Sequence, residues 1–242
     1  MHIQFVIHEA FEGPGYFEYW ALRNGFKTSY TRLYCGDRLP ENVLGFDILI
    51  VLGGPQNPST SRDKSPHFDA IGEKKLISEA IAHNKTVIGV CLGAQLIGEA
   101  LGADYTTSPE PEIGSFPITL TDHGINDPLL SKFNAEEMVG HWHSDMPGLT
   151  KNAEILAFSQ GCPRQIVRYS PLVYGFQCHL ELTPFELPDL LENSRELFKN
   201  RNDHKFIQSE HEILDMQTSR MNHLLESFLD GLVEKYLQKG IK

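Results

Sequence analysis

The chain has 242 residues, of which 40% are hydrophobic and 22% charged, an ordinary composition for a soluble globular protein. No apolar run approaches the roughly 20 residues of a membrane-spanning helix. Met1 leads straight into an apolar segment without a basic stretch, so we expect no secretory signal. The net charge of −11 argues against binding to nucleic acid. Four cysteines are too few for a disulfide scaffold and indicate reduced thiols in a cytoplasmic protein.

Short apolar segments alternate with helical patterns over the first three-fifths of the chain. Strands are predicted at 2–7, 46–52 and 86–91, and the helices between and after them at 16–25, 69–83 and 92–101. Strands that are apolar on both faces and separated by helices are typical of a parallel sheet covered on both sides. We therefore predict an α/β fold with a mostly parallel sheet and helices on both faces.

The pattern changes after about residue 113. Short strands are predicted at 114–121, 137–141, 154–159, 164–169 and 172–178, and no helical period separates the last three. Strands joined by short turns pair antiparallel. We therefore expect antiparallel additions to the parallel sheet.

Residues 185–242 are expected to form a helical extension of a single domain that spans 1–242. Helices are predicted over 185–199 and 205–238 because both segments are rich in leucine, glutamate and lysine. The second carries an apolar stripe at three- and four-residue steps, which must pack against another surface. We expect that surface to belong to the same domain, and a second copy of the chain in a homodimer is the alternative. The stripe consists of Leu224, Leu225, Phe228, Leu229, Leu232 and Tyr236.

Cys91 lies between two glycines where a predicted strand passes into a helix, in the segment Gly89-Val90-Cys91-Leu92-Gly93. Flanking glycines permit the tight turn that presents a nucleophile at the carboxyl edge of a sheet. The N-terminal end of the following helix favours thiolate over thiol, and the backbone N–H of Leu92 points to the place where an oxyanion forms. A buried structural cysteine beside such a turn is the alternative.

His179 and Glu181 end the last predicted strand, with Leu180 between them. Side chains two positions apart on a strand share a face, so the histidine and the glutamate lie side by side. The carboxylate can then bond one imidazole nitrogen while the other nitrogen reaches a thiol. Taken alone, a His-x-Glu segment is more typical of a solvated strand end.

Two further features belong to the same predicted edge of the sheet. Gly53-Gly54-Pro55 follows the strand at 46–52, and glycines there allow backbone N–H groups to approach a ligand. Gln95 stands one helical turn after Cys91 on the same face. A plain turn and a helix-surface glutamine are the alternatives.

In combination, these motifs resemble the class I glutamine amidotransferases, a family with a Cys-His-Glu site. The likeness is strongest to stand-alone proteins similar to the amidotransferase domain of GMP synthetase, and it covers roughly residues 1–184. Further segments support it: Glu12-Gly13-Pro14-Gly15, Glu112-Ile113-Gly114, 141–145 and 161–165. The resemblance implies a flavodoxin-like fold.

By this resemblance, Cys91 would be the nucleophile, His179 the general base and acid, and Glu181 the carboxylate that orients the imidazole. The family commonly has proline where this chain has Leu180. Because the leucine side chain would face away from the site, we expect the three residues to keep their arrangement, although the strand end loses the rigidity of proline.

The resemblance also implies the residues that bind the substrate. Gly54 and Leu92 would supply the N–H groups of the oxyanion hole. Gln95 would bind the amino-acid end of glutamine, together with backbone groups of the loop at His141 and Trp142.

The implied enzyme attacks the side-chain amide of glutamine or a related γ-glutamyl compound. A γ-glutamyl thioester forms on Cys91, ammonia or an amine leaves, and water releases glutamate, chemistry that needs no cofactor. The sequence contains no Walker loop or second domain that could activate an acceptor, so an ammonia user would be a separate synthetase chain. The other version is a free-standing hydrolase of γ-glutamyl amides.

Two alternative functions stay open. An elbow cysteine also occurs in redox and stress-response proteins of the same fold, related to the PfpI family, which lack the His-x-Glu. A non-catalytic glutamine-binding protein could keep the pocket. His141 and His143 with Asp145 have a spacing that could hold a metal ion, but without a further ligand set we predict no metal site.

Overall fold

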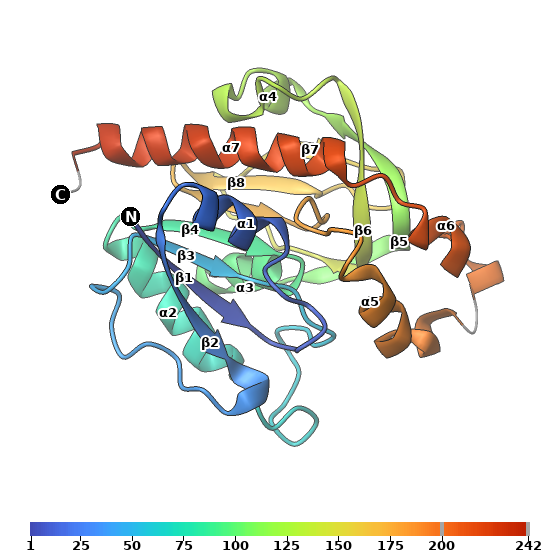
Figure 1. The fold of residues 1–242 in the computed structure, drawn as a ribbon, viewed down its shortest axis with the longest axis horizontal. Coiled ribbons are helices and arrows are strands. Elements are labelled where there is room, and N and C mark those ends of the chain that lie inside the picture. Colours follow the sequence, from blue (N-terminus) through green and yellow to red (C-terminus); the bar gives the residue numbers. More distant parts are fainter. Residues whose placement is uncertain (199–200, 241–242) are drawn as a thin grey trace.

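A ten-stranded sheet forms the centre of the protein across residues 1–198 and 201–240, which the computed structural model describes (Figure 1). Its strands follow the order β10-β5-β7-β8-β9-β4-β3-β1-β2, and β6 pairs with β5 outside that path. The strands are β1 His2–Ile7, β2 Lys27–Arg32, β3 Ile48–Val51, β4 Thr86–Val90, β5 Thr106–Leu120, β6 Glu136–Met146, β7 Glu154–Phe158, β8 Ile166–Ser170, β9 Val173–Phe176 and β10 Phe206–Ile207.

The five neighbours β2, β1, β3, β4 and β9 run parallel and form the half of the sheet that carries the candidate site. The strands predicted at 2–7, 46–52 and 86–91 are confirmed as β1, β3 and β4. The sequence pattern does not predict β2, because its residues Lys-Thr-Ser-Tyr-Thr-Arg are mostly polar. β2 lies at the edge of the sheet, where only one side is paired and polar side chains are tolerated.

The other half of the sheet is largely antiparallel, as predicted. β9 pairs with β8, β8 with β7, β7 with β5 and β5 with β6 in antiparallel register. β5 and β6 are longer than the segments predicted at 114–121 and 137–141. A register shift between Thr107 and Glu112 lets their pairing continue past an irregular stretch.

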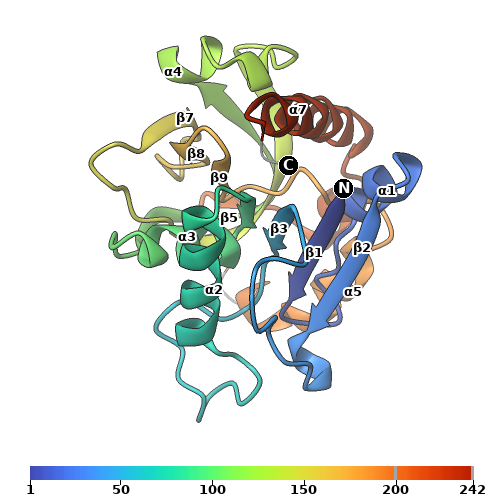
Figure 2. The same cartoon turned by 90° about the vertical axis from the view of Figure 1, so that its left-hand side faces the viewer.

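Helices cover both faces of the sheet, with α1 and α7 on one face and α2 and α3 on the other (Figure 2). Alternate residues of a strand point to opposite faces. In β3, Ile48 and Ile50 pack with the layer of α1 and α7, whereas Leu49 packs with the layer of α2 and α3. The predicted α/β fold is therefore confirmed. The four helices are α1 Tyr16–Arg23, α2 Ala70–Ala82, α3 Leu92–Ala100 and α7 Ser219–Gln238.

The C-terminal extension contains more and shorter elements than the two helices predicted for it. The prediction over 205–238 is wrong at its start, where β10 adds a short parallel strand beside β5. Helix α6 begins separately because Ser209 and Glu212 form a capping box. Residue 199, the last of the helix predicted over 185–199, lies outside the described residues, as do residues 200 and 241–242 of the extension. Shorter elements are η1 Leu33–Cys35, α4 Asp122–Ile125, η2 Pro128–Leu130, α5 Leu187–Asn193, η3 Arg195–Phe198, η4 Arg201–Asp203 and α6 Glu210–Leu214.

The apolar stripe of α7 packs inside this chain. Its six residues are at most 3% exposed and join the core on the α1 face of the sheet. Phe228 meets Tyr174 and Phe176 of β9 edge to face, with ring centroids 5.0 Å apart in both pairs. The stripe therefore covers the domain's own sheet and offers no face to the homodimer considered as the alternative. None of the described helices is long and apolar enough to cross a membrane.

Truncating Phe228 should test how much α7 contributes to the fold. We expect Phe228→Ala to lower the free energy of unfolding by about 3–5 kcal/mol, because a fully buried ring leaves a cavity beneath the helix. Leu237→Ala on the same helix is the matched control, since Leu237 is 59% exposed. Urea denaturation measures both variants, and equal losses would show that α7 is not part of the core.

Candidate active site

The parallel neighbours β4 and β9 bring Cys91 and His179 to one edge of the sheet. Val90 at the end of β4 pairs with Phe176 at the end of β9. The N–H of Cys91 continues this pairing by donating to the carbonyl of Phe176 at 2.7 Å. Because the carboxyl ends of parallel strands meet at one edge, the residues that follow the two strands become neighbours.

Cys91 has the backbone of a nucleophile elbow. Its φ is 49°, an uncommon value for a residue other than glycine, and α3 begins at the next residue. The turn requires both flanking glycines: a Cβ on Gly89 would lie 2.3 Å from the carbonyl of Gly93, and a Cβ on Gly93 would lie 2.0 Å from the carbonyl oxygen of Val51. The buried Sγ lies 3.7 Å from the carbonyl oxygen of Trp142.

Glu181 bonds the His179 ring, as the same-face spacing predicts. His179 Nδ1 lies 2.6 Å from Glu181 Oε1, and both side chains are nearly buried. Burial disfavours the imidazolium, but the Glu181 carboxylate and the Cys91 thiol outweigh it and raise the pKa of His179 well above its usual value. Leu180 between them is buried in the core. His179 is therefore held in the form that can donate a proton.

The segment that carries His179 and Glu181 is tied to its neighbours by backbone hydrogen bonds. His179 and Gly140 of β6 donate to each other's carbonyls at 2.8 and 3.1 Å. The N–H of Tyr16 at the start of α1 donates to the Glu181 carbonyl at 2.8 Å. Gly15 makes this approach possible, since a Cβ there would lie 2.4 Å from that carbonyl oxygen.

Asn222 of α7 holds the same segment from the core side. Its Nδ2 donates to the carbonyls of Leu180 and Leu182 at 2.7 and 3.0 Å. Asn222 itself is buried. The C-terminal extension therefore contributes to the site by fixing the strand end at the position where the family commonly has proline.

His8 fixes the Gly53-Gly54 loop. Its Nδ1 lies 2.9 Å from the Gly53 carbonyl and its Nε2 lies 2.8 Å from Glu73 Oε2, all in the interior. Burial opposes the charged ring, but Glu73 outweighs it and raises the pKa of His8. A Cβ on Gly54 would lie 3.1 Å from Leu92 Cδ2, so the loop packs directly on the elbow. The two residues predicted to form the oxyanion hole, Gly54 and Leu92, are thus adjacent.

A cavity of about 290 Å³ opens beside Cys91 and is lined by Gly54, Gln95 and Trp142, all predicted site residues. Gln95 Nε2 donates to Gln177 Oε1 at 3.2 Å, while Gln95 Oε1 is buried without a hydrogen-bond partner among the described residues. An acceptor is therefore available at the position predicted to bind the amino-acid end of the substrate.

The C-terminal extension supplies a wall of this cavity. Asn193, Ser194 and Leu197, at the end of α5 and in η3, line it opposite the elbow loops. The Nε1 of Trp142 donates to Ser194 Oγ at 3.0 Å and joins the wall to β6. Sequence reasoning missed this contribution because the helical pattern of 185–199 carries no chemical motif.

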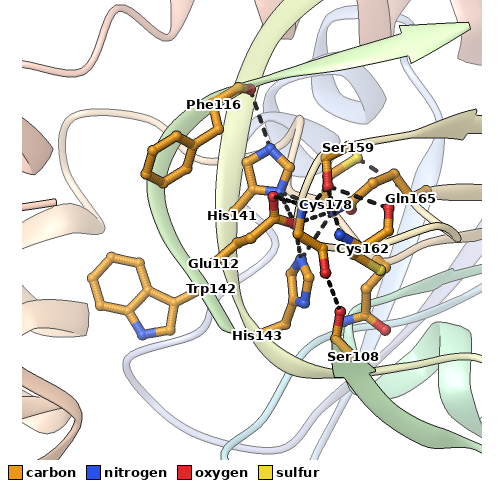
Figure 3. A network of polar contacts seen from close by, with 12 residues as sticks. Ser108, Glu112, Phe116, His141, Trp142, His143, Ser159, Cys162, Gln165 and Cys178 are labelled. Atoms are coloured by element: carbon orange, nitrogen blue, oxygen red, sulfur yellow. Dashed lines mark hydrogen bonds and ion pairs between the residues drawn. The ribbon is translucent and has the colours of Figure 1, made fainter. Parts of the chain in front are cut away.

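His141 does not line the cavity. Its side chain lies in a buried polar network with Glu112 and His143 (Figure 3). Glu112 Oε2 accepts from Ser159 Oγ at 2.7 Å and from Gln165 Nε2 at 2.6 Å. His141 Nδ1 and His143 Nε2 lie 3.6 and 3.4 Å from the same oxygen. The network ties β5 to β6. The predicted role of His141 concerns backbone groups of its loop, so the buried position of its side chain leaves that prediction open.

Three residues of this network could ligate a metal ion. The ligand atoms of Glu112, His141 and His143 all lie within 4.8 Å of one another. Burial lowers the pKa of His141 to about 3, which leaves its ring neutral. Asp145, which the sequence spacing groups with the two histidines, does not belong to this set.

Glu12 also lies at the site, although the sequence motifs assign it no role. A Cβ on Gly53 would lie 2.3 Å from Glu12 Oε2 and 3.5 Å from the Cβ of Cys91. Burial raises the pKa of Glu12 to about 7, against the opposing effect of His179. The signal that could have found it is its place after β1, whose carboxyl end meets the same edge as β4.

The other three cysteines lie outside the elbow, and all four are free thiols. Burial raises the pKa of Cys162 to about 11 and that of Cys178 well above its usual value. Buried thiols of this kind are poor nucleophiles. Cys35 is exposed at the end of η1.

Comparison with known proteins decides the family. The family model described as glutamine amidotransferase class-I matches residues 22–197. The chain belongs to the class I glutamine amidotransferase family. The glutamine amidotransferase-like protein YfeJ of Salmonella typhimurium is 47% identical to this chain over 239 residues, which cover 99% of this chain and 100% of that protein.

Two further relatives support this family membership. The crystal structure of SMU.1228c matches it with a TM-score of 0.94 at 46% identity, covering 96% of this chain and 100% of that one. A glutamine-hydrolyzing GMP synthase subunit of Thermoplasma volcanium is 31% identical over 161 residues, which cover 64% of this chain and 70% of that protein. The resemblance to the amidotransferase subunits of GMP synthases is therefore confirmed.

Removing the Asn222 amide should destabilise the protein. We expect Asn222→Ala to lower the free energy of unfolding by about 1–3 kcal/mol, because the carbonyls of Leu180 and Leu182 lose their donor in the interior. His223→Ala, one position along the same helix at an exposed site, is the matched control. Chemical denaturation of both variants measures the difference, and a loss no larger than that of the control would contradict the role of Asn222.

The raised pKa of Glu12 predicts a pH-dependent stability. The folded protein keeps the Glu12 proton up to about pH 7, whereas the unfolded chain releases it near the usual value of 4.5. The protonated Glu12 carboxyl therefore adds to the free energy of unfolding. This contribution is fully present below the usual pKa of 4.5 and is lost as pH rises through about 7. Glu12→Gln should gain stability relative to the wild type between about pH 5 and pH 8. Thermal denaturation across this range measures the gain, and a difference that stays constant would contradict the burial of the carboxyl.

Proposed function

We propose that this protein cleaves the side-chain amide of glutamine or a γ-glutamyl compound through a γ-glutamyl thioester on Cys91. The observation that carries the proposal is the His179–Glu181 pair, 2.6 Å apart, at the strand end beside the elbow cysteine. This pair is also what the stress-response alternative of the same fold lacks. The geometry therefore favours acyl transfer over redox sensing.

The reaction begins when the Cys91 thiolate attacks the γ-carbonyl carbon. The oxyanion accepts hydrogen bonds from the N–H groups of Gly54 and Leu92. Leu92 is the first residue of α3, where the helix dipole adds to the effect of its N–H. The imidazolium of His179 gives its Nε2 proton to the amide nitrogen, the C–N bond breaks, and ammonia or an amine leaves. His179 then takes a proton from water, which attacks the thioester and releases glutamate.

Binding of the amino-acid end is supported by the cavity at Cys91. The free Oε1 of Gln95 is an acceptor suited to an ammonium group. Trp142 of β6 lines the same cavity, and its backbone carbonyl oxygen lies 3.7 Å from Cys91 Sγ. A γ-glutamyl group that reaches from these contacts to Sγ would present its amide to His179.

The wall formed by α5 and η3 favours a free-standing hydrolase, because part of the substrate cavity is built from the chain's own extension. A separate synthetase chain that receives the ammonia is the second candidate, since one relative is a component of a glutamine-hydrolyzing GMP synthase. Turnover of glutamine by the purified chain above roughly 10 s⁻¹, a common rate for enzymes, would favour the free-standing version.

A screen for glutamate release tests the proposed activity. The purified chain is incubated with glutamine and a panel of γ-glutamyl amides, and glutamate is measured over time. We expect release from at least one compound and none with Cys91→Ala, because the thioester cannot form without the thiol. Equal release by Cys91→Ala, or no release from any compound, would contradict the proposal.

Loss of the Glu181 charge should slow the reaction without unfolding the protein. We expect Glu181→Gln to lower kcat roughly 10²–10⁴-fold, as when a triad loses its orienting carboxylate. Glu192→Gln is the control, because Glu192 is exposed on the same extension. Steady-state kinetics and circular dichroism are measured on both variants. An unchanged kcat would show that Glu181 is not a catalytic residue.

A further inference from the structure

The proposed reaction makes no use of a buried group of polar side chains that we call the Glu112 network. It comes from β5, β6 and the loop between β7 and β8, and none of its members is more than 7% exposed (Figure 3). An ion bound among these side chains would join three separate segments of the chain. The members are Glu112, His141, His143, Ser159 and Gln165.

The neutral ring of His141 turns an unprotonated nitrogen toward Glu112. Its Nε2 lies 3.2 Å from the carbonyl oxygen of Phe116, which can only accept a hydrogen bond, so Nε2 carries the ring proton. Nδ1 then carries a lone pair and lies 3.6 Å from Glu112 Oε2. Burial raises the pKa of Glu112, but His143 and His141 outweigh it and lower that pKa, so the group is a carboxylate. Two ligand atoms without protons therefore face each other.

Gln165 occupies the position of a fourth ligand. Its Nε2 lies 3.2 Å from His141 Nδ1 and 3.1 Å from His143 Nε2. Its Oε1 is buried and has no hydrogen-bond partner among the described residues. Because this amide bonds only to members of the Glu112 network, the contents of the network decide which end turns inward. A half-turn about the Cγ–Cδ bond exchanges the two ends and presents Oε1 as a ligand.

The spacing of these atoms fits a tetrahedral zinc ion. Zinc holds nitrogen and oxygen ligands at about 2.0–2.2 Å, which places the ligands of a tetrahedron about 3.3–3.6 Å apart. Glu112 Oε2 lies 3.6 and 3.4 Å from the two imidazole nitrogens. The Gln165 amide lies closer to Glu112, at 2.6 Å, because it donates a hydrogen bond there. Two imidazoles and a carboxylate favour zinc over magnesium and calcium, which prefer oxygen ligands alone.

Hydrogen bonds from outside hold the ligand side chains in place. Glu112 Oε2 accepts from Ser159 Oγ at 2.7 Å, and Glu112 Oε1 accepts from the N–H of Gly161 at 3.2 Å. The Phe116 carbonyl accepts from His141 Nε2. Outer partners of this kind orient metal ligands and fix the tautomer of a ligating imidazole. The carboxylate and one imidazole are therefore already oriented for an ion.

We propose that the Glu112 network is a binding site for one zinc ion. His143 also lines the cavity at Cys91, so the ion can enter from that side. On binding, the proton of the neutral His143 ring resides on Nδ1, which leaves Nε2 free to ligate. The ligand atoms are Glu112 Oε2, His141 Nδ1, His143 Nε2 and, after the half-turn of its amide, Gln165 Oε1.

The ion would fix the wall of the candidate active site. Trp142 stands between the two histidine ligands on β6, lines the cavity, and has its carbonyl oxygen 3.7 Å from Cys91 Sγ. Metal bonds on both sides of this residue would restrict its backbone. The site is therefore structural, and it acts on the cavity through Trp142 without touching the reacting atoms.

Zinc titration after treatment with a chelator tests the site. It is carried out on Cys91→Ala, because a thiolate beside an imidazole can itself bind zinc. We expect one ion per chain, and a second change, Glu112→Gln, should weaken binding by at least 10- to 100-fold, roughly the loss caused by removing an outer partner. His211→Gln is the matched control, since His211 is exposed beside Asp215. No bound zinc, or equal affinities of the Glu112→Gln and His211→Gln variants, would overturn the proposal.

Crystals of Cys91→Ala grown with zinc locate the ion without any change to its ligands. Anomalous scattering should show a peak about 2.0–2.2 Å from Glu112 Oε2, His141 Nδ1 and His143 Nε2. A peak only at His179 or at exposed histidines, or no peak, would overturn the site even if Glu112→Gln fails to fold.

Hydrogen exchange measures the effect on the cavity wall. Zinc should slow exchange of the backbone amides at 139–146 in Cys91→Ala and leave those of α2, on the opposite face of the sheet, unchanged. If the crystals show the ion but exchange at 139–146 is unaltered, the hold on Trp142 is overturned and the site stands. None of these measurements requires the thioester, so a failure of the proposed function leaves them decisive.

Discussion

The register between β4 and β9 is the constraint on which the candidate site depends. These strands are parallel neighbours that end together, so the residues after them emerge at one point of the sheet edge. Cys91 adopts a positive φ at this point, and His179 follows the adjacent strand β9. Slipping this pairing by one residue would exchange the faces of the side chains and separate the thiol from the imidazole. The parallel core of the fold therefore acts as the scaffold for the proposed chemistry.

The C-terminal extension takes part in this arrangement at two places. The stripe of α7 packs in the core on the α1 face of the sheet. Asn222 of the same helix donates to the carbonyls of the residues on either side of Glu181. The end of α5 and η3 then close part of the substrate cavity. A segment that the family resemblance leaves unassigned thus supports both the strand end and the pocket.

Sequence patterns predict the parallel strands and the elbow because apolar runs and flanking glycines are local signals. The helix predicted over 205–238 is too long because composition alone does not locate helix ends. The capping box of Ser209 and Glu212 marks the start of a separate helix. Asn222 and Glu12 escape prediction for a different reason: each is an ordinary polar residue until the fold brings it to a distant backbone or cavity. The sequence motif at His141 does not indicate where its side chain lies, which the fold places in a buried polar network.

The central claim is that the γ-glutamyl group passes through a thioester on Cys91. Rapid acid quenching during turnover, followed by peptide mass spectrometry, measures this intermediate directly. A γ-glutamyl adduct on the peptide that contains Cys91, formed with wild-type protein and absent in Cys91→Ser, is the predicted result. An adduct on Cys178 or another residue, or glutamate release with no adduct at Cys91, would contradict the account.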